Sequence, residues 1–129
     1  MNLARYFDKN TGTGIFSTSD DITGQANGAI YAKPHVMDDG RVAFIMRDRL
    51  SHRNLKNNPR AHYLFVENGG KSHGVRLHLE MIEESSDDAL VDLYSRRSKR
   101  DGDDEQRFFV TFEIVKALKL LGDQEILIH

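Results

Sequence analysis

The chain has 129 residues, of which 39% are hydrophobic and 29% charged, a balance typical of one globular domain rather than a disordered segment. It contains no Cys, which excludes disulfides, thiolate metal sites and cysteine nucleophiles. The net charge of −2 argues against a general nucleic-acid binder, and no apolar run is long enough to span a bilayer. The length predicts a single domain over residues 1–129. Because the N-terminus also lacks a signal-peptide pattern, we expect the protein in the cytoplasm and not on a membrane.

The first half of the chain predicts one short helix followed by strands. Asn2 is placed to cap a helix whose apolar face carries Leu3, Tyr6 and Phe7. Strands are then expected over residues 14–19, 25–33 and 41–47. Pro34 interrupts the second strand because it lacks a backbone donor, and Asp39-Gly40 predicts a tight turn before the third.

The second half predicts three more strands and one longer helix. Strands are expected over residues 61–67 and 74–83, and the second of these alternates cleanly between apolar and polar side chains. Ser85 is the expected cap of a helix, and its apolar seam is formed by Leu90, Leu93, Tyr94 and Arg97. The basic run over residues 96–100 suits the end of this helix, or alternatively a binding patch.

From residue 107 the strand pattern returns, with Phe108, Val110, Phe112 and Ile114 on one face and Phe109, Thr111 and Glu113 on the other. Residues 115–121 fit helix or strand, and we assign them to a strand because the preceding run is β-rich. Six or more antiparallel strands with flanking helices predict a mainly β fold, a closed or partly closed barrel.

One segment of the chain carries a local excess of positive charge. Residues 47–60 carry five basic residues and one acidic residue, in a chain that is acidic overall. A helical turn beginning at Ser51 would present free backbone N–H groups, and Arg47, Arg49, His52 and Arg53 would surround the same point. This arrangement favours phosphate binding. The alternative is a solvated turn whose arginines pair with acids elsewhere in the chain.

A second candidate region is the strand over residues 25–33, which is rich in small side chains. Such a strand allows the close approach of a flat ligand, or of another subunit. The six histidines show no metal-ligand spacing along the chain, and no serine lies in a nucleophile-elbow context. If this protein performs chemistry, a bound cofactor is expected to carry it.

Five segments together resemble the small FMN-binding split-barrel proteins similar to pyridoxamine 5′-phosphate oxidase. The longest is Arg49-Leu-Ser-His-Arg-Asn-Leu-Lys-Asn-Asn-Pro-Arg-Ala-His-Tyr-Leu-Phe65. It contains the most specific run, Asn54-Leu-Lys-Asn-Asn-Pro59, directly after the basic turn. The other segments begin at residues 14, 27, 42 and 74 and read Gly14-Ile-Phe-Ser-Thr-Ser, Asn27-Gly-Ala-Ile-Tyr-Ala, Val42-Ala-Phe-Ile-Met and Gly74-Val-Arg-Leu-His-Leu. They occur in the family's order and cover most of the chain to about residue 82.

The resemblance implies a homodimer that binds one FMN in each of two grooves between its subunits. By position, Arg49, Ser51 and His52 match the family's phosphate-binding turn, with Arg47 as a helper. The segments matching the strands along the isoalloxazine ring comprise Asn27, Gly28, Ala29, Phe44, Ile45 and Met46.

The resemblance further implies an FMN-dependent oxidoreductase that uses flavin N5 for hydride or electron transfer on a small substrate. The catalytic residues stay unknown, and Tyr31 and His35 are candidates for polar contacts with that substrate. The alternative is a non-catalytic flavin-binding dimer that carries electrons, stores flavin or senses it. The sequence lacks the C-terminal segment that resembles the vitamin B6 site, so we do not expect pyridoxamine phosphate oxidation.

Overall fold

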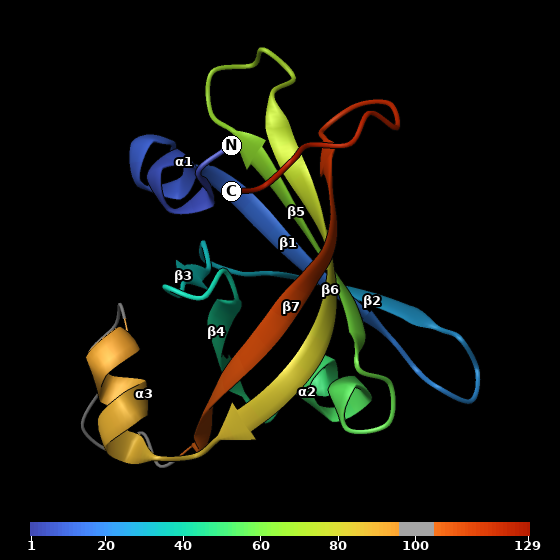
Figure 1. Ribbon diagram of the computed structural model, residues 1–129. Coiled ribbons are helices and arrows are strands. Elements are labelled where there is room, and N and C mark those ends of the chain that lie inside the picture. Colours follow the sequence, from blue (N-terminus) through green and yellow to red (C-terminus); the bar gives the residue numbers. More distant parts are fainter. Residues whose placement is uncertain (96–104) are drawn as a thin grey trace.

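The computed structural model describes residues 1–95 and 105–129 (Figure 1). Its strands are β1 (Gly12–Ser19), β2 (Ala26–Ile30), β3 (His35–Val36), β4 (Val42–Arg47), β5 (Arg60–Glu67), β6 (Gly74–Ser85) and β7 (Arg107–Lys119). Its helices are α1 (Leu3–Lys9), α2 (Leu50–Leu55) and α3 (Asp88–Tyr94). None of the helices in the described ranges is long and apolar enough to cross a membrane.

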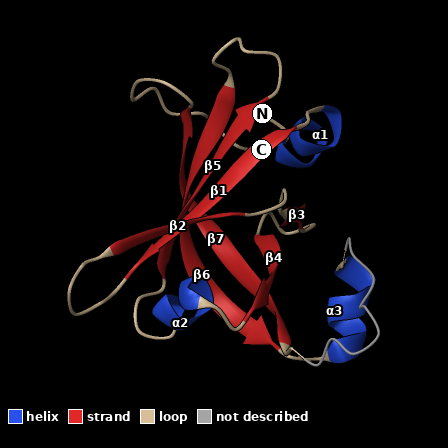
Figure 2. Ribbon diagram, turned by 180° about the vertical axis from the view of Figure 1, so that it is seen from behind, coloured by secondary structure: helices blue, strands red, loops and turns tan. Residues whose placement is uncertain are grey.

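The strands form one antiparallel sheet that curls back on itself. Its order is β2-β1-β5-β6-β7-β4-β3, so β2 and β3 are its two edges. Only residues 31–34 separate these edges in the chain, and an extended chain spans at most about 3.5 Å per residue. The edges are therefore close in space, and the sheet is a barrel split between β1–β2 and β4–β3 (Figure 2). This confirms the predicted fold class.

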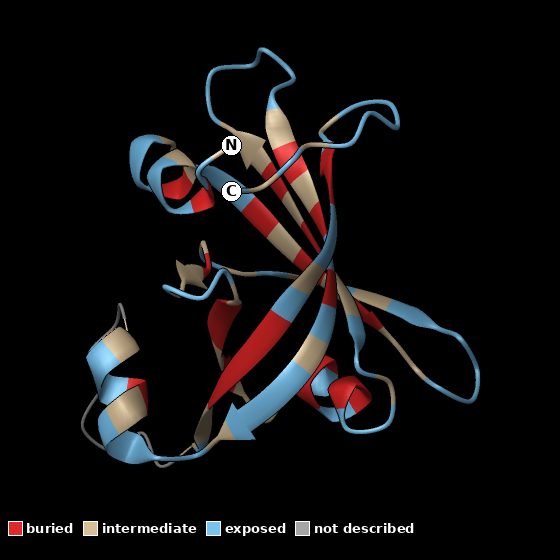
Figure 3. Cartoon of the chain, viewed as in Figure 1, coloured by how far each residue is buried: buried red, intermediate tan, exposed pale blue. Residues whose placement is uncertain are grey.

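The core fills this barrel with aromatic side chains. Phe16 of β1 lies 5.1 Å from Phe44 of β4, measured between ring centres, so the two sides of the split meet inside the barrel. On β6, Val75, Leu77 and Leu79 are buried, as the alternating pattern predicted (Figure 3). The interior side chains thus connect strands that share no backbone hydrogen bonds across the split.

Strand β7 is buried on both faces in its first half. Val110 and Phe112 belong to the main core, whereas Phe109 faces the other side and packs with Ala43 and Val91. Val91 comes from α3, so this helix covers the outer face of β7 (Figure 1). The ambiguous residues after 114 are indeed a strand, which ends at Lys119 rather than at 121.

The helix caps were predicted with mixed success. Asn2 caps α1 as expected, because its side chain accepts a hydrogen bond from the backbone N–H of Arg5. For α3 the prediction was wrong: β6 continues through Ser85, and the carboxylate of Asp87 accepts the bonds from the first helical N–H groups.

The predicted apolar seam of α3 was also partly wrong. Val91 is the residue buried against the sheet, whereas the side chain of Leu93 is 75% exposed. The position of Arg97 and the basic run over residues 96–100 lie outside the described residues.

The predicted strand over residues 25–33 was too long. Strand β2 ends at Ile30, and after Pro34 the chain forms the short strand β3, which pairs with β4. The four residues between β2 and β3 carry the chain across the split and belong to neither strand.

Candidate functional site

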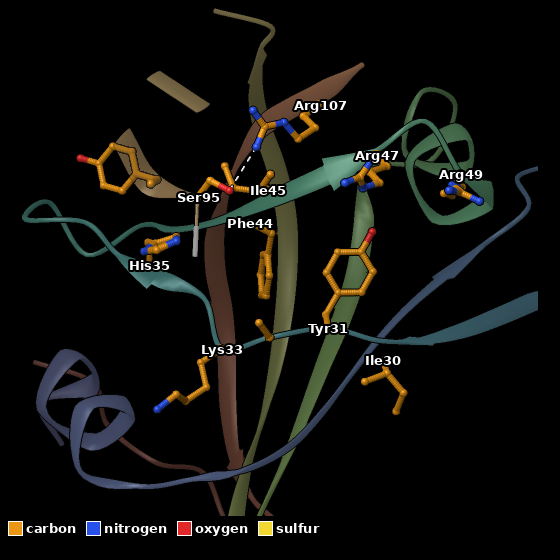
Figure 4. Close-up of a pocket in the computed structure, with 12 residues that line it drawn as sticks. Ile30, Tyr31, Lys33, His35, Phe44, Ile45, Arg47, Arg49, Ser95 and Arg107 are labelled. Atoms are coloured by element: carbon orange, nitrogen blue, oxygen red, sulfur yellow. Dashed lines mark hydrogen bonds between the residues drawn. The ribbon is translucent and has the colours of Figure 1, made fainter. Parts of the chain in front are cut away.

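A pocket of about 410 Å³ opens at the split, where the chain crosses from β2 to β3 (Figure 4). This volume lies within the range of about 300–1,000 Å³ that is common for small-molecule sites. The lining residues come from this crossing, β4, the start of α2, the end of α3 and β7: Ile30, Tyr31, Ala32, Lys33, His35, Phe44, Ile45, Arg47, Arg49, Tyr94, Ser95 and Arg107.

Tyr31 is fixed at the centre of this pocket by its backbone. Its N–H donates to the carbonyl of Gly14 at 3.0 Å, and its carbonyl accepts from the hydroxyl of Tyr63 at 3.2 Å. A Cβ at Gly14 would overlap that hydroxyl, so the glycine is what permits this close approach. The Tyr31 ring is thereby held beside Phe44, and its hydroxyl points toward Arg47 (Figure 4).

Burial raises the pKa of the Tyr31 hydroxyl, and the positive charge of Arg49 opposes this effect only in part. The hydroxyl therefore stays protonated at neutral pH and can donate a hydrogen bond into the pocket.

Two of the predicted phosphate-binding arginines meet on one carboxylate. Arg49 donates to both oxygens of Glu105, from Nε at 2.7 Å and from Nη2 at 2.8 Å. Arg47 donates from Nη1 to Oε2 of the same residue at 3.0 Å. The hydrogen bonds from Arg49 hold the pKa of Glu105 below its ordinary value, and those from Arg47 add to this effect. The arginines thus present their donors at one point, as predicted, and an acid from another element pairs with them, as the alternative interpretation required.

Arg107 lies beside Arg47 at a more enclosed end of the pocket, because the two residues are partners in the register of β7 and β4. Its side chain is only 10% exposed. It donates to the hydroxyl of Ser95 at 3.1 Å (Figure 4). It also donates to the carboxylate of Asp92 at 2.6 Å. These bonds tie α3 to the first residue of β7. Tyr94 completes this end, with its ring 5.3 Å from that of His35.

The basic turn begins differently from the prediction. Helix α2 starts at Leu50 with Arg49 as its N-cap, and no side chain caps it, so Ser51 is not the cap. Ser51 instead lies inside the first turn and is buried, and its hydroxyl accepts a hydrogen bond from the side-chain amide of Asn27 at 3.2 Å. The bond joins β2 to α2, two segments that the resemblance had assigned to different parts of one cofactor site.

His52 does not join the arginines. It is fully buried and stacks on Phe108, with ring centres 4.1 Å apart. Its ring nitrogens face two carboxylates, Glu84 at 2.9 Å and Asp48 at 3.3 Å. Arg53 is exposed and pairs with Asp48. The expectation that both side chains surround the same point as Arg47 and Arg49 was therefore wrong.

The remaining predicted ring-binding residues have different environments. Ile45 and Phe44 line the pocket, whereas Met46 is fully buried in the core. Gly28 is exposed and Ala29 half-buried on the edge strand β2, away from the pocket lining. Contacts of these residues with a cofactor stay predictions.

Sequence analysis missed half of the pocket, including Tyr94, Ser95 and Arg107. These residues come from the end of α3 and the start of β7, beyond the part of the chain that the resemblance covers well. They reach the pocket because β7 pairs with β4. The start of β7 reads Arg107-Phe-Phe-Val, and a single basic residue before an apolar run does not indicate a place in the pocket. Tyr31 and His35, expected to contact a substrate, both line the pocket.

No protein-family model matches the sequence, and no curated protein matches it. Solved structures do match. An FMN-binding protein from Syntrophomonas wolfei subsp. wolfei has a TM-score of 0.72 at 17% identity, covering 94% of this chain and 85% of that one. Group A Streptococcus HupZ has a TM-score of 0.73 at 12% identity, covering 96% and 95%.

A third match is a Clostridium acetobutylicum protein related to general stress protein 26, of the pyridoxinephosphate oxidase family. It has a TM-score of 0.66 at 16% identity, covering 96% of this chain and 89% of that one. The chain therefore has the split-barrel fold of pyridoxine phosphate oxidase-like proteins.

Proposed function

We propose that this protein binds FMN at the split of the barrel and acts as a flavin-dependent oxidoreductase, with a second copy of the chain completing each cofactor groove. Arg47 and Arg49 would hold the phosphate, and the pocket beside Tyr31 and Phe44 would receive the rings. The fold supports this proposal, since a protein that shares it is described as FMN-binding.

The observation that carries the proposal is the convergence of Arg47 and Arg49 on two oxygens of one carboxylate. A guanidinium donates paired, charge-assisted bonds to phosphate as readily as to carboxylate. The donor geometry for a terminal phosphate is therefore already present, and Glu105 occupies it in the free chain. FMN binding requires that Glu105 release these donors.

The chain's own residues would position the flavin rather than react. When bound, FMN supplies hydride or electron transfer through its ring system. The protonated Tyr31 hydroxyl can donate a hydrogen bond to a flavin or substrate oxygen, and Phe44 keeps water from the inner wall. No residue of the pocket is assigned as an acid or base.

The test is the affinity of the purified protein for FMN, measured by quenching of flavin fluorescence. The wild-type chain is expected to bind one FMN per subunit, and the Arg47→Ala, Arg49→Ala double variant to bind at least about tenfold more weakly, because charged hydrogen bonds contribute roughly 1.5–3 kcal/mol each. Arg53→Ala is the matched control, since Arg53 lies on the same turn but outside the pocket.

Equal affinity of the double variant and the wild type would place the phosphate elsewhere, and failure of the wild type to bind FMN would refute the proposal. Turnover with NAD(P)H and an electron acceptor distinguishes an enzyme from the non-catalytic alternative.

A further inference from the structure

Two histidines face each other on the outer surface of the barrel, on neighbouring strands. His62 of β5 is directly opposite His78 of β6 in the antiparallel register, with ring centres 5.3 Å apart and ring planes at 65°. The adjacent residues Tyr63 and Leu77 are buried in the core, so the imidazoles point away from it. His78 is exposed and His62 half-buried, which leaves the pair open to solvent on one side.

The separation of the rings matches that of two imidazoles bound to one metal ion. Zn–N bonds of about 2.1 Å place each ring centre about 3.2 Å from the metal, so two rings at a tetrahedral angle have centres about 5.2 Å apart. The observed 5.3 Å agrees with this value.

The charged neighbours of the pair carry both signs. The Arg76 guanidinium donates to the carbonyls of Lys119 and Gly122 at the end of β7. Its charge still acts on the pair, since burial, then His78 and then Arg76 lower the pKa of His62. Lys116 is opposite His78 on β7 and is exposed, so its flexible ammonium can turn to solvent. Glu80 lies on the same face of β6, two residues from His78, and is the diagonal neighbour of His62. It brings a negative charge to this face and is opposite Arg60 in the register.

We propose that His62 and His78 form a binding site for a late first-row transition-metal dication such as Zn²⁺, with water completing the coordination. Imidazole nitrogen suits these ions, whereas Mg²⁺ and Ca²⁺ prefer oxygen ligands. Among the described residues no group of three or more His, Asp or Glu is arranged around one point, so the site has two protein ligands. Neither histidine lines the pocket at the split, so this site is independent of the proposed flavin site.

The test is a Zn²⁺ titration at neutral pH in competition with a chromophoric chelator, on the wild type and three variants. The wild type is expected to bind one Zn²⁺ per chain. His62→Ala and His78→Ala are each expected to lower the Zn²⁺ affinity at least about tenfold. Loss of a residue that only hydrogen-bonds to a metal ligand already lowers metal affinity about 10- to 100-fold. His73→Ala, which removes an exposed histidine from the neighbouring turn, is the control and is expected to bind like the wild type.

A second measurement keeps the proposal testable if a variant fails to fold. In NMR spectra of the wild type, Zn²⁺ is expected to shift the ring resonances of His62 and His78 together, before those of the other histidines, whereas Mg²⁺ leaves them unchanged. Equal affinity of the wild type and both variants, or shifts confined to other histidines, would overturn the proposal. FMN affinity, measured on the same samples, is expected to stay at the wild-type level.

Discussion

Two parts of the basic turn, separated by a single residue, have opposite environments. The side chain of Arg49 is 69% exposed and reaches into the pocket, where it pairs with Glu105. Ser51 and His52 are buried and hydrogen-bonded to Asn27 and Glu84. In the sequence alone, these residues resemble a single anion-binding motif.

The difference shows that the turn has two roles. Its buried part anchors α2 to the barrel, and its exposed part offers charge to a ligand. Loss of a buried, fully hydrogen-bonded side chain leaves a cavity and an unpaired partner, whereas loss of an exposed charge leaves only solvent. Substitutions in the two parts should therefore separate stability from binding.

The largest effect is expected for His52→Ala. It removes the ring stacked on Phe108 and leaves the Glu84 carboxylate without its partner. The free energy of unfolding should fall by about 3 kcal/mol, which urea denaturation would measure. Arg53→Ala, one residue along on the exposed face, should change it by less than about 0.5 kcal/mol. Similar losses in the two variants would mean that the turn has no buried anchor.

A smaller loss is expected for Asn54→Ala. The side-chain amide of Asn54 donates to the hydroxyl of Thr18 at 3.0 Å, and both residues are buried. Its removal leaves that hydroxyl without its donor and should destabilise the protein by about 1–2 kcal/mol in the same denaturation experiment. The exposed Asn57→Ala is the control and should be close to neutral. Since Asn54 lies outside the pocket, a change in FMN affinity at full folding would contradict this division of roles.

The smallest effect is expected for Glu105→Gln. The glutamine is neutral and competes less for Arg47 and Arg49, so FMN should bind up to about fivefold more tightly, the size expected of an exposed ion pair. The free energy of unfolding at neutral pH should fall slightly, because an exposed ion pair contributes little to stability. Weaker FMN binding in this variant would show that Glu105 supports the site rather than competes for it.

The ion pairs of Glu105 with Arg47 and Arg49 also make the stability of the protein depend slightly on pH. Hydrogen bonds from Arg49 and then Arg47 lower the pKa of Glu105 from its ordinary 4.5, so its contribution to stability is present above that value and is lost as pH falls through the lowered pKa. Denaturation curves measured across acidic pH should show this loss in the wild type and not in Glu105→Gln.

Local patterns predicted most of the strands. The alternation in β6 and the turn at Asp39-Gly40 both depend on near neighbours in the chain, and the structure confirms both. Ends of elements were harder, because they depend on contacts that local propensity does not describe. Residue 85 stays in β6 as a result of pairing with Phe109 on β7, so the cap of α3 moves to Asp87.

The candidate site could be predicted only where its residues are contiguous. Arg47 and Arg49 stood out by their charge, and Tyr31 and His35 by their nearness to the ring site that the resemblance implied. Arg107 carries no such signal, because its partners Asp92 and Ser95 lie on another element. The pairing of Glu105 with both arginines spans more than fifty residues of chain, and the facing of His62 and His78 depends on strand register.

The sequence by itself determined the class of this protein: a single β-rich chain without thiol chemistry, with a basic turn over residues 47–60. Those properties follow from composition and from interactions between near neighbours in the chain. The tertiary structure decided which basic residues face the pocket, which are buried as anchors and which acid pairs with them. Such choices depend on burial and on the register of distant strands, and both arise only when the sheet closes.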